Sequence, residues 1–171
     1  MKVLIVVDMQ YDFVDGCLGT KEAQAIVPIV KKKVEEAVEN GDLIIYTQDT
    51  HYDDYLETRE GKGLPVEHCI EGTGGWDIVP SVKPPLGYMN WDTYEKYTFG
   101  DYGLPAWIMR RCFGKSDITE IELVGLCTDI CVVSNALLIK SYFYETCDIS
   151  VDATCCAGVT PMTHEAALKT M

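Results

Sequence analysis

Short runs of apolar residues recur along the chain and end in polar residues. The first run, residues 2–7, is rich in valine and isoleucine and ends at Asp8. Because neither side of such a run is polar, the pattern indicates strands that are buried on both faces of a sheet. The sequence predicts strands at residues 2–7, 43–47, 93–97, 121–125 and 149–151.

The segments between these runs have the periodicity of helices. In residues 23–39 apolar residues recur at three- and four-residue steps, and an Asn-Gly stop follows. Residues 131–144 are apolar almost all round, which is typical of a helix packed beneath other elements. Further helices are predicted at residues 103–111 and 163–171, the second with Thr163 as its cap.

This alternation of strands and helices predicts a Rossmann-like α/β fold with three layers, α/β/α, and a mostly parallel sheet of five or six strands. A chain of 171 residues is the size of one ordinary domain, so we expect a single domain over residues 1–171. Residues 50–91 interrupt the alternation, because glycine and proline break any regular period there. Such long excursions are usually functional, so their polar residues are candidate ligands.

Charge and the first residues limit the partners of the chain. The formal net charge of −13 argues against nucleic acid and anionic membranes, because the field of the protein would repel both. The apolar run before Asp8 is too short for a signal peptide or a membrane span. We therefore expect a cytoplasmic protein that acts on small molecules, with its eight cysteines reduced.

Three side chains with complementary chemistry follow or end predicted strands, and the carboxyl ends of parallel strands meet at one edge of a sheet. They are Asp8, Lys96 and Cys131. A cysteine at the start of a helix favours a thiolate, a nearby ammonium lowers the thiol pKa further, and a carboxylate can act as general base. Each residue also has a plainer interpretation: a buried core cysteine, a turn aspartate and an exposed edge-strand lysine. Their shared position favours a catalytic set.

A second polar group follows the second predicted strand. Asp49 and His51 stand two residues apart at the strand end, and His68 lies in the irregular excursion. Two imidazoles and a carboxylate suit zinc, or manganese or iron in a more water-rich shell. Glu60 and Glu57 lie between the histidines and are candidate oxygen ligands. The alternative is that both histidines are ordinary polar loop residues.

Five motifs in a fixed order resemble those of the isochorismatase-like cysteine hydrolases, and within them most nearly the nicotinamidases. The match spans nearly the whole chain. The motifs are D-x-Q-x-D-F (Asp8, Gln10, Asp12, Phe13), D-x-H (Asp49, His51), H-C-x-x-G-T (His68, Cys69, Gly72, Thr73), K-x-T-F (Lys96, Thr98, Phe99) and G-x-x-T-D-x-C-V (Gly125, Thr128, Asp129, Cys131, Val132).

The resemblance implies hydrolysis of a small amide, most nearly nicotinamide to nicotinate and ammonia, as in NAD salvage. It implies that Cys131 attacks the amide carbonyl to form a thioester, that Asp8 handles the proton and that Lys96 holds the charge of both. It also implies an oxyanion hole made by the backbone N–H groups of Cys127 and Cys131, with a cis peptide bond between Leu126 and Cys127.

The resemblance also implies partners for the site. In nicotinamidases a metal ion binds the pyridine nitrogen of the substrate. The corresponding ligands in this chain are Asp49, His51 and His68, and zinc is the first candidate for the divalent ion that they would bind. Relatives of this fold commonly assemble as dimers or tetramers, so a homo-oligomer is expected.

Three departures from the family pattern affect these expectations. Many nicotinamidases carry a third metal histidine, where this chain offers Glu60 or Glu57. An aromatic residue often precedes the loop proline, where this chain has Leu64, so Phe13 alone remains of the pair of rings that would contact nicotinamide. The family usually adds a sixth strand after its last helix, whereas this sequence ends at Met171.

Other functions are compatible with parts of the pattern. An amidase or N-carbamoyl hydrolase for another small amide would share the catalytic residues but not the pyridine pocket. Isochorismatase activity itself is associated with members that lack the cysteine nucleophile. A module that binds a small molecule or metal without catalysis is a different class, and so is a redox sensor built on Cys155 and Cys156 or on Cys127.

Overall fold

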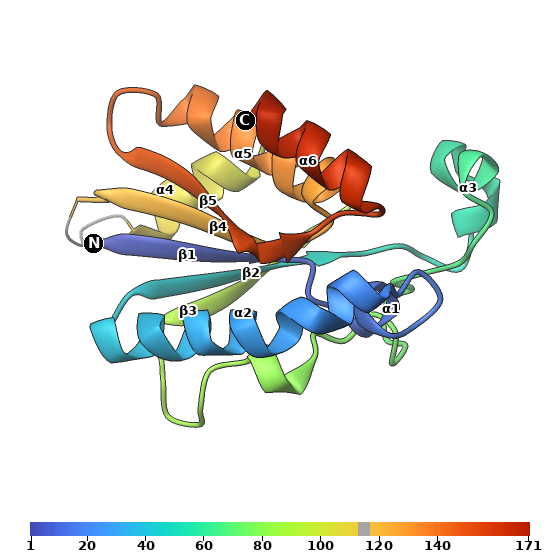
Figure 1. The fold of residues 1–171 in the computed structure, drawn as a ribbon, viewed down its shortest axis with the longest axis horizontal. Helices are drawn as coiled ribbons and strands as arrows, with labels where there is room; N and C mark the ends of the chain where they lie inside the picture. Colours follow the sequence, from blue (N-terminus) through green and yellow to red (C-terminus); the bar gives the residue numbers. More distant parts are fainter. Residues whose placement is uncertain (113–116) are drawn as a thin grey trace.

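The structure is a computed structural model that describes residues 1–112 and 117–171. In this part of the chain five parallel strands form one sheet in the order β3-β2-β1-β4-β5 (Figure 1). The α/β expectation is confirmed, and the sheet has five strands that are all parallel. The strands are β1 (Lys2–Val7), β2 (Leu43–Asp49), β3 (Trp91–Lys96), β4 (Glu120–Leu126) and β5 (Asp148–Ala157).

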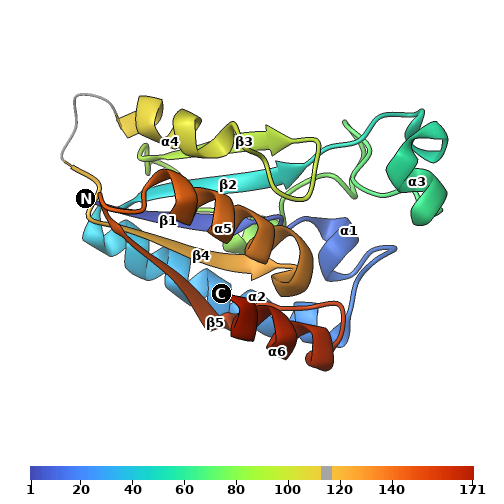
Figure 2. The same ribbon diagram turned by 90° about the horizontal axis from the view of Figure 1, so that it is seen from above.

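The helices cover both faces of the sheet, which explains why the inner strands are mostly apolar. Alternate residues of β1 pack with α4 (Leu104–Cys112) and α5 (Val133–Tyr142) on one face, and with α2 (Lys21–Asn40) on the other. The last helix, α6 (Pro161–Thr170), lies beside α5, as both views show (Figure 2). Among the described residues no helix has the length and apolar content needed to cross a membrane.

Most predicted ends shift by one or two residues, and the differences in two elements have a clear structural cause. β5 extends well beyond residues 149–151. A register shift between Leu123 and Gly125 of β4 lets the strand pair with β4 again further on, after polar residues that interrupt its apolar run. The cap of α6 is Thr160 rather than Thr163: the Thr160 hydroxyl accepts the Thr163 N–H (3.2 Å) in a capping box.

The excursion after β2 crosses the carboxyl edge of the sheet, where Figure 1 shows α3 reaching beyond the strand ends. A bridge between His51 and Ile70 ties its two limbs together. It is mostly irregular, as predicted, but includes short helical turns that the sequence did not reveal. These are η1 (Tyr55–Glu57), α3 (Arg59–Gly63) and η2 (Pro80–Val82), and a further short helix, α1 (Tyr11–Val14), follows β1.

Candidate active site

Asp8 lies directly after β1, where the backbone takes an unusual conformation. Its φ angle is +46°, which residues other than glycine rarely adopt and which tends to occur at functional sites. The Asp8 N–H donates to the Thr47 carbonyl (3.3 Å), and the Thr47 hydroxyl donates to Asp8 Oδ1 (2.7 Å). These bonds fix the carboxylate so that Oδ2 lies 2.8 Å from Lys96 Nζ.

Lys96 is the last residue of β3, and the strand register places it opposite Asp49 of β2. Its ammonium is fully buried and lies 2.8 Å from Asp8 Oδ2, 2.8 Å from Asp49 Oδ1 and 3.6 Å from Cys131 Sγ. Burial alone would lower the pKa of Lys96, but the charges of Asp8, Cys131 and Asp49 raise it well above its ordinary value. The exposed edge-lysine interpretation is therefore wrong, although β3 is an edge strand.

Cys131 lies in η3 (Thr128–Val132), a single π-helical turn that leads into α5. Such turns are rare and occur frequently at functional sites. Burial raises the pKa of the Cys131 thiol well above its ordinary value; Lys96 opposes this shift, while Asp8 and Asp49 add to it. The sequence-based expectation of a lowered thiol pKa did not include this burial, which outweighs the effect of Lys96.

Burial also raises the pKa of the Asp8 carboxyl, even though Lys96 lowers it. A base with a raised pKa holds a proton more readily than an ordinary aspartate. The pair of Asp8 and Cys131 is therefore suited to passing one proton between them, with the Lys96 ammonium beside both groups.

The turn between β4 and η3 needs a glycine. Gly125 has a φ angle of +112°, and a Cβ atom there would lie 2.2 Å from the Val7 carbonyl oxygen. The next peptide bond but one, between Leu126 and Cys127, is cis, as the resemblance implied. The Cys127 carbonyl then accepts the N–H groups of Ile130 and Val132, both at 3.1 Å, which closes the turn.

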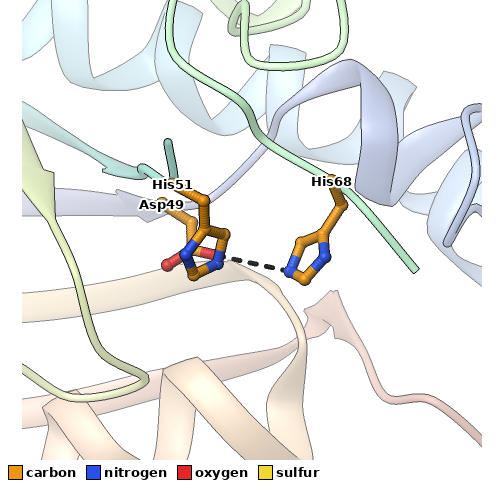
Figure 3. A group of neighbouring side chains, drawn as sticks. All are labelled: Asp49, His51 and His68. Carbon is orange, nitrogen blue, oxygen red and sulfur yellow. Dashed lines mark ion pairs between the residues drawn. The ribbon is translucent and has the colours of Figure 1, made fainter. Parts of the chain in front are cut away.

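Asp49, His51 and His68 form a buried cluster beside this group. Their ligand atoms lie within 4.8 Å of one another, and Figure 3 shows the side chains converging from the end of β2 and from the excursion. His68 Nδ1 pairs with the Val66 carbonyl (2.8 Å), which leaves the lone pair of Nε2 directed at the cluster. Burial alone would lower the pKa of His51, but the Asp49 carboxylate raises it.

Glu60 is the nearby acid that faces the histidines. Its Oε1 lies 3.7 Å from His51 Nε2 and 4.0 Å from His68 Nε2, whereas Glu57 is exposed in η1. Within the described residues, His51 Nε2 and Glu60 Oε1 are buried without a hydrogen bond of good geometry. Buried polar atoms left in this way are costly unless a ligand satisfies them. Two imidazoles and two carboxylates therefore suit a divalent cation at this place.

A cavity of about 280 Å³ joins the sulfur to this cluster. Phe13 and Leu64, which occupy the two positions that the family resemblance assigns to substrate binding, both line it. The Phe13 ring meets the His68 ring edge-on, with centroids 5.5 Å apart. The full lining is Phe13, Leu18, Thr20, Ala23, Asp49, Glu60, Leu64, His68, Phe99, Cys127, Ile130, Cys131 and Val159.

Several residues that hold the site were given no role by the sequence. The Gln10 side chain pairs with both backbone groups of Asp49, donating to its carbonyl (2.9 Å) and accepting from its N–H (2.7 Å). Asp12 accepts the N–H of Cys69 (2.8 Å) and so anchors the loop after His68. Gln10 and Asp12 belong to the first motif, which was the available signal.

Tyr55 was missed entirely, because it lies in the irregular excursion without any motif. Its buried ring packs against His51 (4.7 Å between centroids) and His68 (5.0 Å), and its hydroxyl donates to the Leu64 carbonyl (3.0 Å). Cys155 and Cys156, one basis of the redox alternative, are free thiols in β5 and do not line the cavity, whereas Cys127, the other basis, is a free thiol that does.

A family model for the isochorismatase domain matches residues 2–171 of this chain. The chain belongs to the isochorismatase family. Among its curated relatives in the family, an uncharacterized isochorismatase family protein PncA of Bacillus subtilis is 30% identical over 80% of this chain and 76% of its own length. The nicotinamidase/pyrazinamidase of Mycobacterium tuberculosis is 26% identical over 92% of each chain.

Solved structures in the isochorismatase family have the same fold. The pyrazinamidase of Pyrococcus horikoshii in complex with zinc matches with a TM-score of 0.81 and 27% identity, covering 99% of this chain and 93% of that one. The N-carbamoylsarcosine amidase of Thermoplasma acidophilum matches with a TM-score of 0.76 and 25% identity, covering 98% and 91%. Family membership and these relatives identify the chain as an amidohydrolase.

Proposed function

We propose that this chain hydrolyses nicotinamide to nicotinate and ammonia through a thioester on Cys131. One observation carries the proposal: a single cavity is lined both by Cys131 and by Asp49 and His68 of the cation cluster. An amide held near the cluster would present its carbonyl group to the sulfur. The relatives named as nicotinamidase and pyrazinamidase support the same reaction.

The chemistry of the catalytic group follows from its contacts. Cys131 Sγ attacks the amide carbonyl carbon while Asp8 accepts the thiol proton. The backbone N–H groups of Cys127 and Cys131 stabilise the resulting oxyanion. Asp8 gives its proton to the departing nitrogen, ammonia leaves, and a water deprotonated by Asp8 hydrolyses the thioester and restores the thiol. Lys96 offsets the negative charge of carboxylate and sulfur in each step.

Asp49, His51, His68 and Glu60 are the residues that would hold the cation. Mixed imidazole and carboxylate donors favour zinc, with manganese or iron as alternatives. When bound, such an ion supplies an electrophilic site for a ring nitrogen and so orients the amide. The edge-on Phe13 ring limits the tilt of an aromatic substrate beside His68.

The charge of the cavity favours a neutral amide over one that carries a carboxylate. The lining includes two acids, Asp49 and Glu60, and among the described residues it includes no arginine or lysine. A carboxylate-bearing N-carbamoyl compound would be desolvated in this cavity without an arginine or lysine of the described lining to pair its charge. This weakens the N-carbamoyl hydrolase alternative. A module without catalysis would have no use for the buried contact between Lys96 and Cys131.

Ammonia release from matched amides tests the proposal. We expect turnover of nicotinamide and pyrazinamide, and for N-carbamoylsarcosine a kcat/KM lower by a factor of about 100 or more, which corresponds to one buried, unpaired charge. A higher kcat/KM for N-carbamoylsarcosine than for nicotinamide would contradict the proposed reaction and favour the N-carbamoyl hydrolase alternative. No ammonia from any amide would favour the non-catalytic module.

Removing the cation is expected to weaken substrate binding more than it weakens the fold. The KM for nicotinamide should rise about tenfold or more after chelation, since orientation by the ion is lost. The Tm should fall by no more than about 5 °C, because Tyr55 and the Gln10 side chain still hold the cluster residues. Differential scanning calorimetry and initial rates, before and after zinc is restored, provide the measurements. Parallel loss of fold and activity would make the ion structural.

Leu64→Phe is expected to strengthen nicotinamide binding. Leu64 is 38% exposed at the cavity, so a ring fits there and adds a stacking contact of about 0.5–1.5 kcal/mol. Steady-state kinetics should show KM lower by about threefold to tenfold with kcat unchanged. Leu56→Phe, on an exposed leucine that does not line the cavity, is the matched control and should leave KM unchanged. A raised KM for Leu64→Phe would mean that the ring blocks the cavity.

A further inference from the structure

Asn135 is a fully buried amide in the first turn of α5, a helix whose buried side chains are otherwise apolar. Its side chain makes three hydrogen bonds, all to backbone groups. Nδ2 donates to the Cys131 carbonyl (2.9 Å) and to the Phe99 carbonyl (3.1 Å), and Oδ1 accepts the Asp101 N–H (3.1 Å). Burial of an amide is costly unless it is bonded, so these partners account for its presence.

The partners of Asn135 belong to two segments that the active site brings together. Cys131 is the proposed nucleophile, and its π-helical turn shifts the regular backbone pairing of the helix start. Phe99 lines the cavity and stands three residues after Lys96. One buried side chain therefore connects the segment that carries the sulfur with the segment that carries the ammonium and one wall of the pocket.

We propose that Asn135 is a positioning residue, which holds Cys131 at its working distance from Lys96 and fixes the Phe99 wall. The inference rests on the proposed role of Cys131 as nucleophile. The hydrogen bonds of the Asn135 side chain all go to backbone groups, and Asn135 does not line the cavity, so it acts through the backbone of its three partners.

Two substitutions of Asn135 distinguish its hydrogen bond to Cys131 from its hydrogen bonds to Phe99 and Asp101. A threonine at position 135 can still donate to the carbonyl four residues earlier, that of Cys131, but it is too short for the loop of Phe99 and Asp101. Asn135→Ala loses all three bonds. Ser134→Ala is the matched control: it removes a hydrogen bond to the Ile130 carbonyl (2.6 Å) on the same helical turn without touching that connection.

The rate at which an activated ester acylates Cys131 is the readout, because it does not depend on the physiological amide. With p-nitrophenyl acetate, the sulfur bonds to the acetyl carbon, p-nitrophenolate leaves with the electron pair of the broken C–O bond, and Asp8 accepts the thiol proton. The burst of p-nitrophenolate gives the rate at saturation, Cys131→Ala gives the background from other cysteines, and peptide mass spectrometry locates the acetyl group. All rates are taken well below the Tm of each variant.

We expect a burst rate within about twofold of the unmodified chain for Ser134→Ala, about threefold to tenfold lower for Asn135→Thr, and about tenfold or more lower for Asn135→Ala. A purely structural amide would lower Tm in both variants and leave the burst rate per folded site within twofold, which would overturn the proposal. Should Asn135→Ala fail to fold, Asn135→Thr alone decides.

The same assay separates this inference from the proposed function. If the unmodified chain shows a burst at Cys131 but does not hydrolyse nicotinamide, the proposed substrate is wrong. The role of Asn135 is then still tested by comparing the burst rates of its variants. An unmodified chain with no burst at Cys131 overturns both, because there is then no nucleophile to position.

Discussion

Cys131→Ala is expected to lower ammonia release from nicotinamide by a factor on the order of 10⁴ or more, because the thiol that contacts Lys96 and forms the proposed thioester is lost. The free energy of unfolding should change by only about 1 kcal/mol, since the substitution removes one small buried atom from the core. Coupled detection of ammonia and urea denaturation monitored by circular dichroism measure the two effects. The expected result is a folded chain without turnover.

Cys155→Ala is the matched control for this experiment. Cys155 is as buried as Cys131 but belongs to the core on the opposite face of the sheet, outside the cavity lining. Its replacement should cost a similar free energy of unfolding and leave kcat/KM within about twofold. If Cys155→Ala abolished turnover instead, or if Cys131→Ala kept more than a few per cent of it, another thiol would carry the reaction.

The sequence predicted best those elements whose environment is uniform. β1 begins and ends at the predicted residues, because it is apolar on both faces and its last residue is followed by a buried carboxylate. β5 was predicted too short, because Asp152 and Thr154 are polar and residues 152–154 are partly or fully exposed, so the apolar run that marks a strand stops before the strand does. The start of α6 was misplaced because Thr160 and Thr163 are both good caps, and only the backbone conformation decides between them.

The candidate site was predictable where residues occupy strand ends, and unpredictable where burial decides. The parallel arrangement brings Asp8, Lys96 and Cys131 to one edge of the sheet, as expected from their positions. The raised pKa of the Cys131 thiol was not foreseen, because the sequence shows that a cation is near but not how completely water is excluded. The role of Asn135 depends on backbone groups more than thirty residues away, which no local pattern encodes.

Lys96→Met is expected to damage both stability and activity. Among the described residues, it removes the one lysine or arginine that contacts two buried carboxylates, Asp8 and Asp49. Breaking one side of a buried ion pair typically costs about 3–5 kcal/mol, and we expect a loss of this size in the free energy of unfolding. Ammonia release should fall by about 10³ or more, because charge on Asp8 and on the sulfur is no longer offset.

The pH dependence of the Lys96→Met loss identifies its cause. Without the ammonium, the buried carboxylates have folded-state pKa values above their unfolded values, so the folded chain holds more protons than the unfolded one. Its stability relative to the unmodified chain should therefore decrease as pH rises from about 5 to about 8, where these groups would otherwise ionise. Denaturant titrations at both pH values measure this difference. A deficit that is the same at both would indicate lost packing instead of uncompensated charge.

Lys33→Met is the matched control that shows how much of the Lys96→Met effect depends on the full burial of Lys96. Lys33 also contacts two carboxylates, Asp152 at 2.7 Å and Glu122 at 3.3 Å, but its side chain is 22% exposed and does not line the cavity. Because water screens such pairs, the free energy of unfolding should fall by only about 1 kcal/mol, with kcat/KM unchanged. Adding Asp8→Asn to Lys96→Met should recover part of the lost stability and none of the activity, since the double variant has one buried charge fewer and no base. Equal losses for Lys33→Met and Lys96→Met would contradict the argument that full burial makes the Lys96 contacts decisive.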